Sequence, residues 1–209
     1  QEILLYEAGK LQIKNDPQHA LLILSSLQQM QGKKQEEAAL LKTALLFELK
    51  EFQQLINEKE TLRIAIKEKN SPTLSLFIGR SQFSLHQYND ALNTLEPLLS
   101  SSFLTKKDHP LLLLTLAATH YHLGNHQEVD TFFHAFKSSF ANDPLFPHLL
   151  YIKSLNEKEK GNIATAQECL EKIIDNYPDF ILAEEVHFAY NRFLFSQRQW
   201  EKSHDGFAT

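Results

Sequence analysis

The strongest constraint on how this chain can fold is a pair of small residues that recurs along it at one fixed separation. A small side chain at both points lets two helices approach closely, so each pair marks a helix hairpin. The recurrence therefore predicts helix pairs stacked one after another rather than a single central core. The pairs are Ala8 with Ala20, Gly79 with Ala91 and Ser154 with Ala166, and in a further pair Ala117 precedes the larger Val129.

The residues between these points have the spacing of amphipathic helices. Apolar residues recur at three- and four-residue intervals, as in Ala20, Leu24 and Leu27. No segment alternates apolar and polar residues between turn signals, so we predict no strands and about twelve helices of roughly 12 to 18 residues. Four helix starts are predicted to carry an N-cap residue followed by a proline, at Asp16-Pro17, Ser71-Pro72, Asp108-His109-Pro110 and Asp143-Pro144.

The hairpins fall into one register along nearly the whole chain. The clearest unit begins near Pro147 and carries Ser154, Gly161, Ala166, Leu170, Ile173 and Pro178. In this register the chain resembles the tetratricopeptide repeat family, whose unit is a helix pair of about 34 residues. The resemblance implies an all-α fold, an α-solenoid of antiparallel helix pairs wound into a right-handed superhelix. Pro97 falls inside a predicted second helix and is expected to kink or shorten it.

We expect residues 1–209 to form a single array of repeats. Five full repeats are predicted to start near residues 1, 36, 72, 110 and 147, with an incomplete sixth from about residue 184. The unit near 36 places Lys59 where an apolar residue belongs. The sixth unit, with Trp200 and Phe207, stops at Thr209 inside its second helix. We therefore expect the natural chain to be longer.

The segment from Leu170 to Phe207 resembles a narrower group within the family. It reads Leu-x-x-Ile-Ile-x-x-Tyr-Pro-Asp, continues as Ala183-Glu184-Glu185, and ends in an aromatic-rich helix. Bacterial periplasmic repeat proteins are similar, including the lipoprotein of the outer-membrane β-barrel assembly machinery and the related cell-division coordinator. This resemblance implies the periplasm or a membrane anchor, and otherwise the cytoplasm. Such a lipoprotein starts with an acylated cysteine, where this chain has Gln1.

Composition and charge exclude several classes of protein. Hydrophobic residues make up 43% and charged residues 22%, as in globular proteins rather than disordered chains. The longest apolar run, residues 20–24, is far shorter than the roughly 20 residues that cross a bilayer. The net charge is −5 and no basic stripe occurs, so we expect no nucleic-acid partner.

No constellation of residues predicts catalysis, a cofactor or a metal. The sequence has no Gly-rich phosphate loop and no nucleophile or zinc motif. His122 and His126 are four residues apart, but Gly124 between them marks a turn, so they are not expected to share a helix face. We interpret Cys169 as a small hydrophobe and residues 157–160, with their mixed charges, as a solvated helix end. We therefore predict a protein that is not an enzyme.

The resemblance implies that the first helix of each pair lines a concave, protein-binding face. Aromatic residues and arginines recur at positions that point to that face, and these residue types dominate interface hot spots. The alternative is that the aromatic residues pack between neighbouring repeats, although arginine is rarely buried unpaired. The side chains with which the family grips acidic chaperone tails are missing from the corresponding positions. The candidate protein-binding residues are Phe47, Arg80, Phe83, Tyr121, Tyr151, Arg192 and Phe195.

We therefore expect a scaffold that binds another protein or a peptide in its concave face. The alternative is a helical regulatory or adaptor region of a larger enzyme, or of an envelope-assembly protein. A third possibility, a metal-dependent enzyme, has only the ten histidines in its favour.

Overall fold

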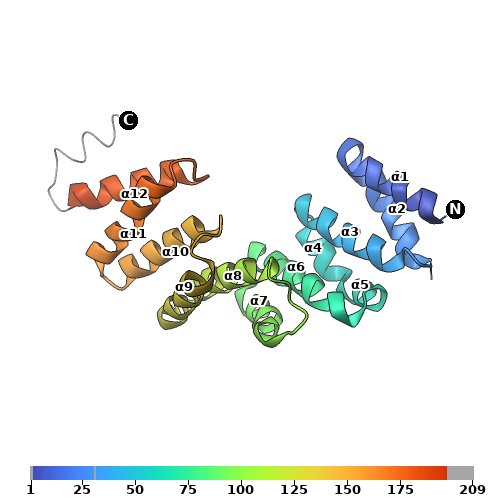
Figure 1. Cartoon of the computed structure of the whole chain (residues 1–209), viewed down its shortest axis with the longest axis horizontal. Helices are drawn as coiled ribbons and strands as arrows, with labels where there is room; N and C mark the ends of the chain where they lie inside the picture. The colour runs from blue at the N-terminus through green and yellow to red at the C-terminus, as the bar shows by residue number, and fades with distance from the viewer. Residues whose placement is uncertain (1, 31, 197–209) are drawn as a thin grey trace. The chain divides into compact units, whose positions relative to one another are not determined.

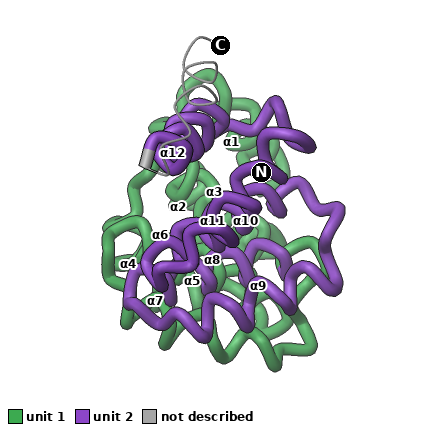
Figure 2. The backbone as a smooth tube through the Cα atoms, turned by 90° about the vertical axis from the view of Figure 1, so that its left-hand side faces the viewer, with its two compact units in different colours: residues 1–108 green, residues 109–209 purple. Residues whose placement is uncertain are grey.

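The computed structural model describes residues 2–30 and 32–196, and over these ranges the chain is helical and contains no β-strand (Figure 1). The predicted all-α fold class is confirmed. The chain divides into two compact units, residues 1–108 and residues 109–209, which Figure 2 distinguishes by colour. We call them unit 1 and unit 2.

Unit 1 contains seven α-helices and two short 3-10 helices within its described residues. These elements are α1 (Glu2–Asn15), α2 (Pro17–Gln29), α3 (Gln35–Glu48), α4 (Phe52–Asn57), α5 (Lys59–Ala65), η1 (Glu68–Asn70), α6 (Ser71–Ser84), α7 (Tyr88–Leu95) and η2 (Glu96–Ser100).

Unit 2 contains five α-helices within its described residues, and the first begins at the boundary between the units. These helices are α8 (Asp108–His122), α9 (His126–Phe140), α10 (Phe146–Glu159), α11 (Ile163–Asn176) and α12 (Ala183–Ser196). The predicted repeat starts lie close to the first residues of α1, α3, α6, α8, α10 and α12.

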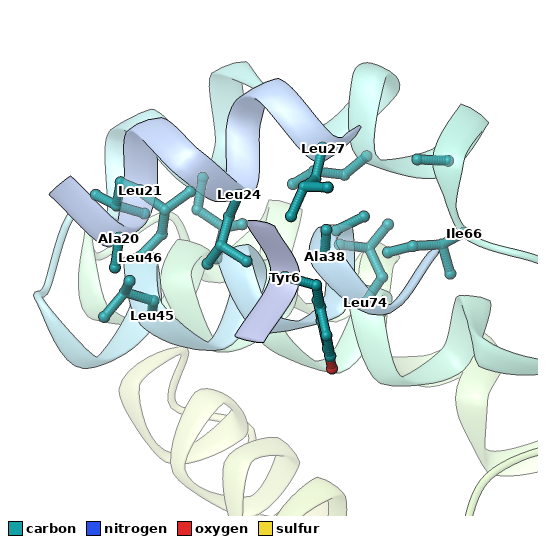
Figure 3. Close-up of a cluster of buried hydrophobic side chains, with 14 of the residues drawn as sticks. Tyr6, Ala20, Leu21, Leu24, Leu27, Ala38, Leu45, Leu46, Ile66 and Leu74 are labelled. Atoms are coloured by element: carbon teal, nitrogen blue, oxygen red, sulfur yellow. The ribbon is translucent and has the colours of Figure 1, made fainter. Parts of the chain in front are cut away.

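Unit 1 is held together by aliphatic side chains from successive helices. Helix α1 packs on α2, α2 on α3, and α3 on α6. Leu24 of α2, Leu46 of α3 and Leu74 of α6 are fully buried and belong to one cluster (Figure 3). Burying a leucine side chain contributes about 1.5–3 kcal/mol, so the contacts between neighbouring hairpins account for much of the stability of this unit.

Unit 2 has a more aromatic core. Helix α9 packs on α10, α10 on α11, and α11 on α12. The ring of Phe146 stacks against Phe133 and Phe136, with centroids 6.2 and 6.1 Å apart. Ala166 and Cys169 of α11 are buried in the same cluster. The interpretation of Cys169 as a small hydrophobe is confirmed, and burial raises the pKa of its thiol.

The contact between α6 and α7 explains why one of the paired small residues is glycine. A Cβ atom on Gly79 would lie 2.4 Å from both Cγ and Cδ2 of Leu95. Leu95 is fully buried, so its side chain has no room to move aside.

One backbone turn recurs in four helix hairpins. After the first helix, an N–H bonds back to a carbonyl five residues earlier, and the residue before that N–H is left-handed. The hydrogen bonds run from Glu51 to Leu46, Gln87 to Gln82, Asn125 to His120 and Asn162 to Glu157, at 2.9, 2.9, 2.9 and 2.8 Å. The left-handed residues are Lys50, His86, Gly124 and Gly161, with φ of 60°, 60°, 73° and 81°. This arrangement satisfies carbonyls at the helix end and is most often built with glycine.

The predicted N-caps are confirmed at only one of the four helix starts. The carboxylate of Asp16 accepts a hydrogen bond from the N–H of His19 at 3.0 Å, and Pro17 begins α2. The prediction for Ser71 was wrong, because Ser71 is already helical and follows Asn70, which makes no side-chain cap.

The predictions for Asp108 and Asp143 were also wrong, because each belongs to a turn that precedes or opens the helix. The Thr105 hydroxyl accepts from the Asp108 N–H at 3.2 Å and donates to its carboxylate at 2.8 Å. The Asp143 carboxylate accepts from the N–H of Leu145 at 2.9 Å, just before α10 begins.

Two predicted second helices are interrupted. The helix after α3 breaks at Glu58 into α4 and α5, and the Glu58 carboxylate pairs with the buried Lys42 of α3. Helix α7 ends before Pro97, and the chain continues as the 3-10 helix η2. Of the two effects expected at Pro97, a kink or a shortening, the structure shows the shortening.

Unit 2 encloses a group of charged side chains between α9 and α10. The Lys153 amine lies 2.7 Å from Asp130 Oδ1 and 2.5 Å from Glu157 Oε1. The Lys160 amine contacts the same two carboxylates at 2.8 and 2.7 Å, and Asn162 donates to Glu157 Oε2 at 2.6 Å. We call these five residues the α9–α10 ion network.

The expectation of a solvated helix end at residues 157–160 was wrong for Glu157, which is 3% exposed. Burial by itself would raise the pKa of its carboxyl. The hydrogen bonds from Lys153, Lys160 and Asn162 outweigh burial and lower that pKa to about 2. These three partners are close to Glu157 in the sequence, but Asp130, which contacts both lysine amines, comes from a different helix and cannot be found from the pattern of α10.

Glu157→Gln should destabilise unit 2 at pH 7 by about 2–3 kcal/mol, because it leaves two ammonium groups short of a carboxylate. The folded-state pKa lies below the ordinary value of 4.5. The contribution of Glu157 is therefore complete above about pH 4.5 and disappears as the pH falls towards 2. Urea unfolding at several pH values should show the difference between wild type and variant shrinking in acid. Glu168→Gln, at an exposed position of α11, should cause no such change, and identical pH slopes for wild type and E157Q would contradict the prediction.

The recurring turn predicts opposite effects for two substitutions. Gly161→Ala should cost about 1 kcal/mol from left-handed strain, since nothing lies within 4 Å of the added Cβ atom. Lys50→Gly should stabilise unit 1 by roughly 0.5–1 kcal/mol, because the exposed Lys50 already has a φ of 60°. Thermal unfolding measures both, and shifts of the same sign would show that the turn does not govern them.

Gly79→Ala should destabilise unit 1 by about 1–3 kcal/mol through overpacking against Leu95, although alanine is the better helix former. Asn93→Ala, at an exposed position of the same hairpin, serves as the control and should not destabilise. Chemical denaturation compares the two variants, and a G79A midpoint at or above that of wild type would refute the close contact.

Candidate partner-binding surfaces

A groove of about 790 Å³ opens on unit 2 between α10, α11 and α12. Its lining mixes aliphatic and aromatic side chains with both signs of charge. The lining residues are Tyr151, Ser154, Leu155, Lys158, Ile163, Leu170, Glu184, Glu185, Phe188, Ala189, Arg192 and Phe193. We call this the α10–α12 groove.

Two of the predicted binding residues, Tyr151 and Arg192, line this groove together. Tyr151 is half-buried, and burial followed by the charge of Glu185 raises the pKa of its hydroxyl, so it stays a neutral hydrogen-bonding group. Arg192 is exposed, and its guanidinium carbon lies 5.9 Å from the ring centroid of Phe188 on the same helix. The groove can therefore offer apolar contact, a hydroxyl and a cation to one ligand.

Several lining residues were not among the predicted site residues. Phe188 is 57% exposed, a large fraction for an aromatic side chain, and it lies one helical turn before Arg192. The repeat register places Phe188 at a position that points to the concave face, so the sequence could have identified it as a binding residue. The sequence could not identify the charged lining residues Lys158, Glu184 and Glu185 as binding residues, because charged residues at helix ends are common on any surface.

The other two predicted residues of unit 2 have different surroundings. The hydroxyl of the half-buried Tyr121 donates to Glu159 Oε1 at 2.7 Å. Burial and then Glu159 raise the pKa of Tyr121, so this hydroxyl remains protonated and joins α8 to α10. Phe195 is 55% exposed on α12.

The predicted residues of unit 1 form an aromatic cluster with an arginine. Phe47 of α3 lies 5.3 Å from Phe52 of α4 and 5.3 Å from Phe77 of α6, between ring centroids. The guanidinium carbon of Arg80 lies 4.3 Å from the centroid of the Phe47 ring. Phe47 thus packs between helices, as the alternative interpretation held, while it also supports a cation.

Phe83 lies farther along α6 and is half-buried. Its ring centroid is 5.7 Å from that of Tyr88 at the start of α7, so this aromatic pair belongs to the hairpin of α6 and α7.

The histidines that raised the possibility of a metal have other surroundings. His120 is buried and stacks on Phe132 with centroids 5.4 Å apart. His122 ends α8 and His126 begins α9, on either side of the left-handed Gly124. Across residues 2–30 and 32–196, no three His, Cys, Asp or Glu side chains are grouped so as to hold a metal ion. In the same part of the chain no helix is both long and apolar enough to cross a membrane.

Comparisons with known proteins agree with this architecture. Residues 149–179 match the family model for the tetratricopeptide repeat. No curated protein sequence shows a significant match to the chain. A tetratricopeptide repeat protein from Parabacteroides merdae ATCC 43184 is 19% identical with a TM-score of 0.68, and the alignment covers 99% of this chain and 76% of that one.

Two further solved structures share the fold. YrrB, a TPR protein with an unusual peptide-binding site, is 19% identical with a TM-score of 0.66, covering 88% of this chain and 91% of its own. The MamA RS-1 ArsTM double mutant is 16% identical with a TM-score of 0.65, covering 83% and 93%. The chain is therefore a helical repeat protein with the fold of tetratricopeptide repeat proteins, and its residues 149–179 are a repeat of that family.

Proposed function

We propose that this protein is an interaction scaffold that holds a segment of a partner polypeptide, without catalysis and without a metal or cofactor. In unit 2 the partner occupies the α10–α12 groove. The observation that carries the proposal is the convergence of Tyr151, Phe188 and Arg192 from two helices on one open groove. Tyrosine and arginine are the residue types most enriched at binding hot spots, and exposed phenylalanine adds apolar area.

The dimensions and chemistry of the groove support a peptide as its occupant. A volume of about 790 Å³ is within the usual range for ligand sites, which is about 300–1,000 Å³. Because the groove carries both carboxylates and cations, it suits a partner with apolar side chains flanked by polar ones. YrrB, which has the same fold, has a peptide-binding site, and this likeness supports the class of ligand only.

We propose that the remaining predicted residues add contacts within their own units. In unit 2 these are Tyr121 and the exposed Phe195. In unit 1 they are Phe47, Arg80 and Phe83, which lie on α3 and α6.

Phe188→Ala should weaken peptide binding by more than about 1 kcal/mol, or roughly fivefold, while the fold is retained because Phe188 is 57% exposed. Peptides can be selected against the chain from a phage-displayed library of random dodecamers. Titration calorimetry of the selected peptides then gives Kd for wild type and variant.

The matched control is Ile181→Ala, which removes an apolar side chain that is 81% exposed in the same unit but outside the groove. This variant should bind the peptides as wild type does. A library in which no peptide is enriched would contradict the scaffold proposal. Enrichment with equal Kd for wild type and F188A would show that the groove is not the binding surface.

A further inference from the structure

We infer that unit 1 carries a separate recognition site in which the Arg80 guanidinium binds the carboxylate side chain of an Asp or Glu in a partner polypeptide. This inference rests on the proposed scaffold function, since it needs a polypeptide partner. Its site is on α3 and α6, so it uses none of the residues of the α10–α12 groove.

The position of the guanidinium is fixed by aromatic side chains. The guanidinium carbon of Arg80 lies 4.3 Å from the centroid of the Phe47 ring, and that ring also packs against the rings of Phe52 and Phe77. A guanidinium stacked on a ring keeps the N–H groups along its edge free to donate. A carboxylate can accept two of these N–H groups in a single plane.

No acceptor on the described part of the chain uses those donors. Across residues 2–30 and 32–196, Arg80 forms no side-chain hydrogen bond and no ion pair, and its guanidinium instead makes a cation–π contact with Phe47. Burial alone accounts for the lowered pKa of Arg80, with no carboxylate acting in the opposite direction. A cation held partly out of water with nothing to neutralise it is an incomplete ion pair.

The buried cations of this protein show what a completed pair looks like. Lys42 in unit 1 has Glu58, and Lys153 in unit 2 has Asp130 and Glu157. Both lysines therefore find their counter-ions within the chain. Arg80 has an aromatic ring in place of a carboxylate, which leaves the carboxylate to come from outside.

Charge favours a side-chain carboxylate over a phosphate. On α3 and α6 the basic residues are Lys42 and Arg80, and Lys42 is already paired with Glu58. These two helices thus offer one free positive charge, which matches a carboxylate and leaves a phosphate dianion half neutralised. A side-chain carboxylate also reaches Arg80 on its own methylene arm, so the peptide backbone need not be desolvated against three phenylalanine rings.

The test is a double-mutant cycle on selected peptides. A library of random dodecamers fused through their C-termini, which offers acidic side chains but no free terminal carboxylate, is selected against wild type, Arg80→Gln and Arg63→Gln. Arg63 is the matched control, because it is an exposed arginine of unit 1 paired with Glu60. An acidic peptide from the wild-type pool and its Glu→Gln or Asp→Asn counterpart are then titrated against each protein.

Wild type and R63Q should both enrich acidic peptides, and loss of the acidic group should raise Kd about tenfold on each. On R80Q the same peptide change should leave Kd nearly unaltered, because the two groups act as one pair. If R80Q does not fold by circular dichroism, Arg80→Lys takes its place. That variant keeps the charge without the planar fork, so the effect of the peptide change should shrink.

Equal acidic content in the wild-type and R80Q pools, with Kd effects that simply add, would overturn the inference and leave the scaffold proposal intact. Acidic peptides that respond to Phe188→Ala but not to Arg80→Gln would also overturn it, because they would place the acidic group elsewhere. Absence of any enriched peptide would instead overturn the scaffold proposal, and the inference with it.

Discussion

The turn that closes four of the helix hairpins is the constraint on which much of the structure depends. The same five-residue-back hydrogen bond ends α3, α6, α8 and α10. It fixes where the second helix starts, and therefore which residues of the two helices face each other. Gly79 has to be small because the turn brings α7 so close that Leu95 occupies the space of a Cβ atom. The donors of this bond are separated by 36, 38 and 37 residues, which is the period found in the sequence.

Buried charged side chains supplement this backbone frame at two contacts between helices. Lys42 joins α3 to the break between α4 and α5, and the α9–α10 ion network joins α9 to α10. Buried ions are weak contributors to stability compared with well-packed apolar residues, but breaking one partner of such a pair is costly. We therefore propose that these pairs act mainly by disfavouring other registers between the helices, since a shifted helix would leave an ammonium group buried without a carboxylate.

Helices and hairpins could be predicted from the sequence because they depend on local spacing. The three- and four-residue periodicity and the paired small residues are visible without any knowledge of packing, and Pro97 marked the end of α7 correctly. N-caps were predicted poorly because a single Asp or Ser fits both a cap and a neighbouring turn, as Asp143 shows. Glu157 pairs with Lys153 and Lys160, which are near it along the chain, but both amines are also shared with Asp130 of α9. No pattern within one helix reveals such a partner on another.

Two arginines at the same position in the repeat show what the sequence could and could not predict about the candidate sites. Arg192 lies over Phe188, which is four residues earlier on its own helix, so this local contact leaves the guanidinium at the surface. Arg80 lies over Phe47, which comes from the preceding first helix, so the contact draws the guanidinium between two helices and away from water. The repeat register predicts that both side chains point to the concave face. The register does not predict which guanidinium is shielded from water. That difference in solvent exposure decides how strongly each guanidinium can attract a carboxylate.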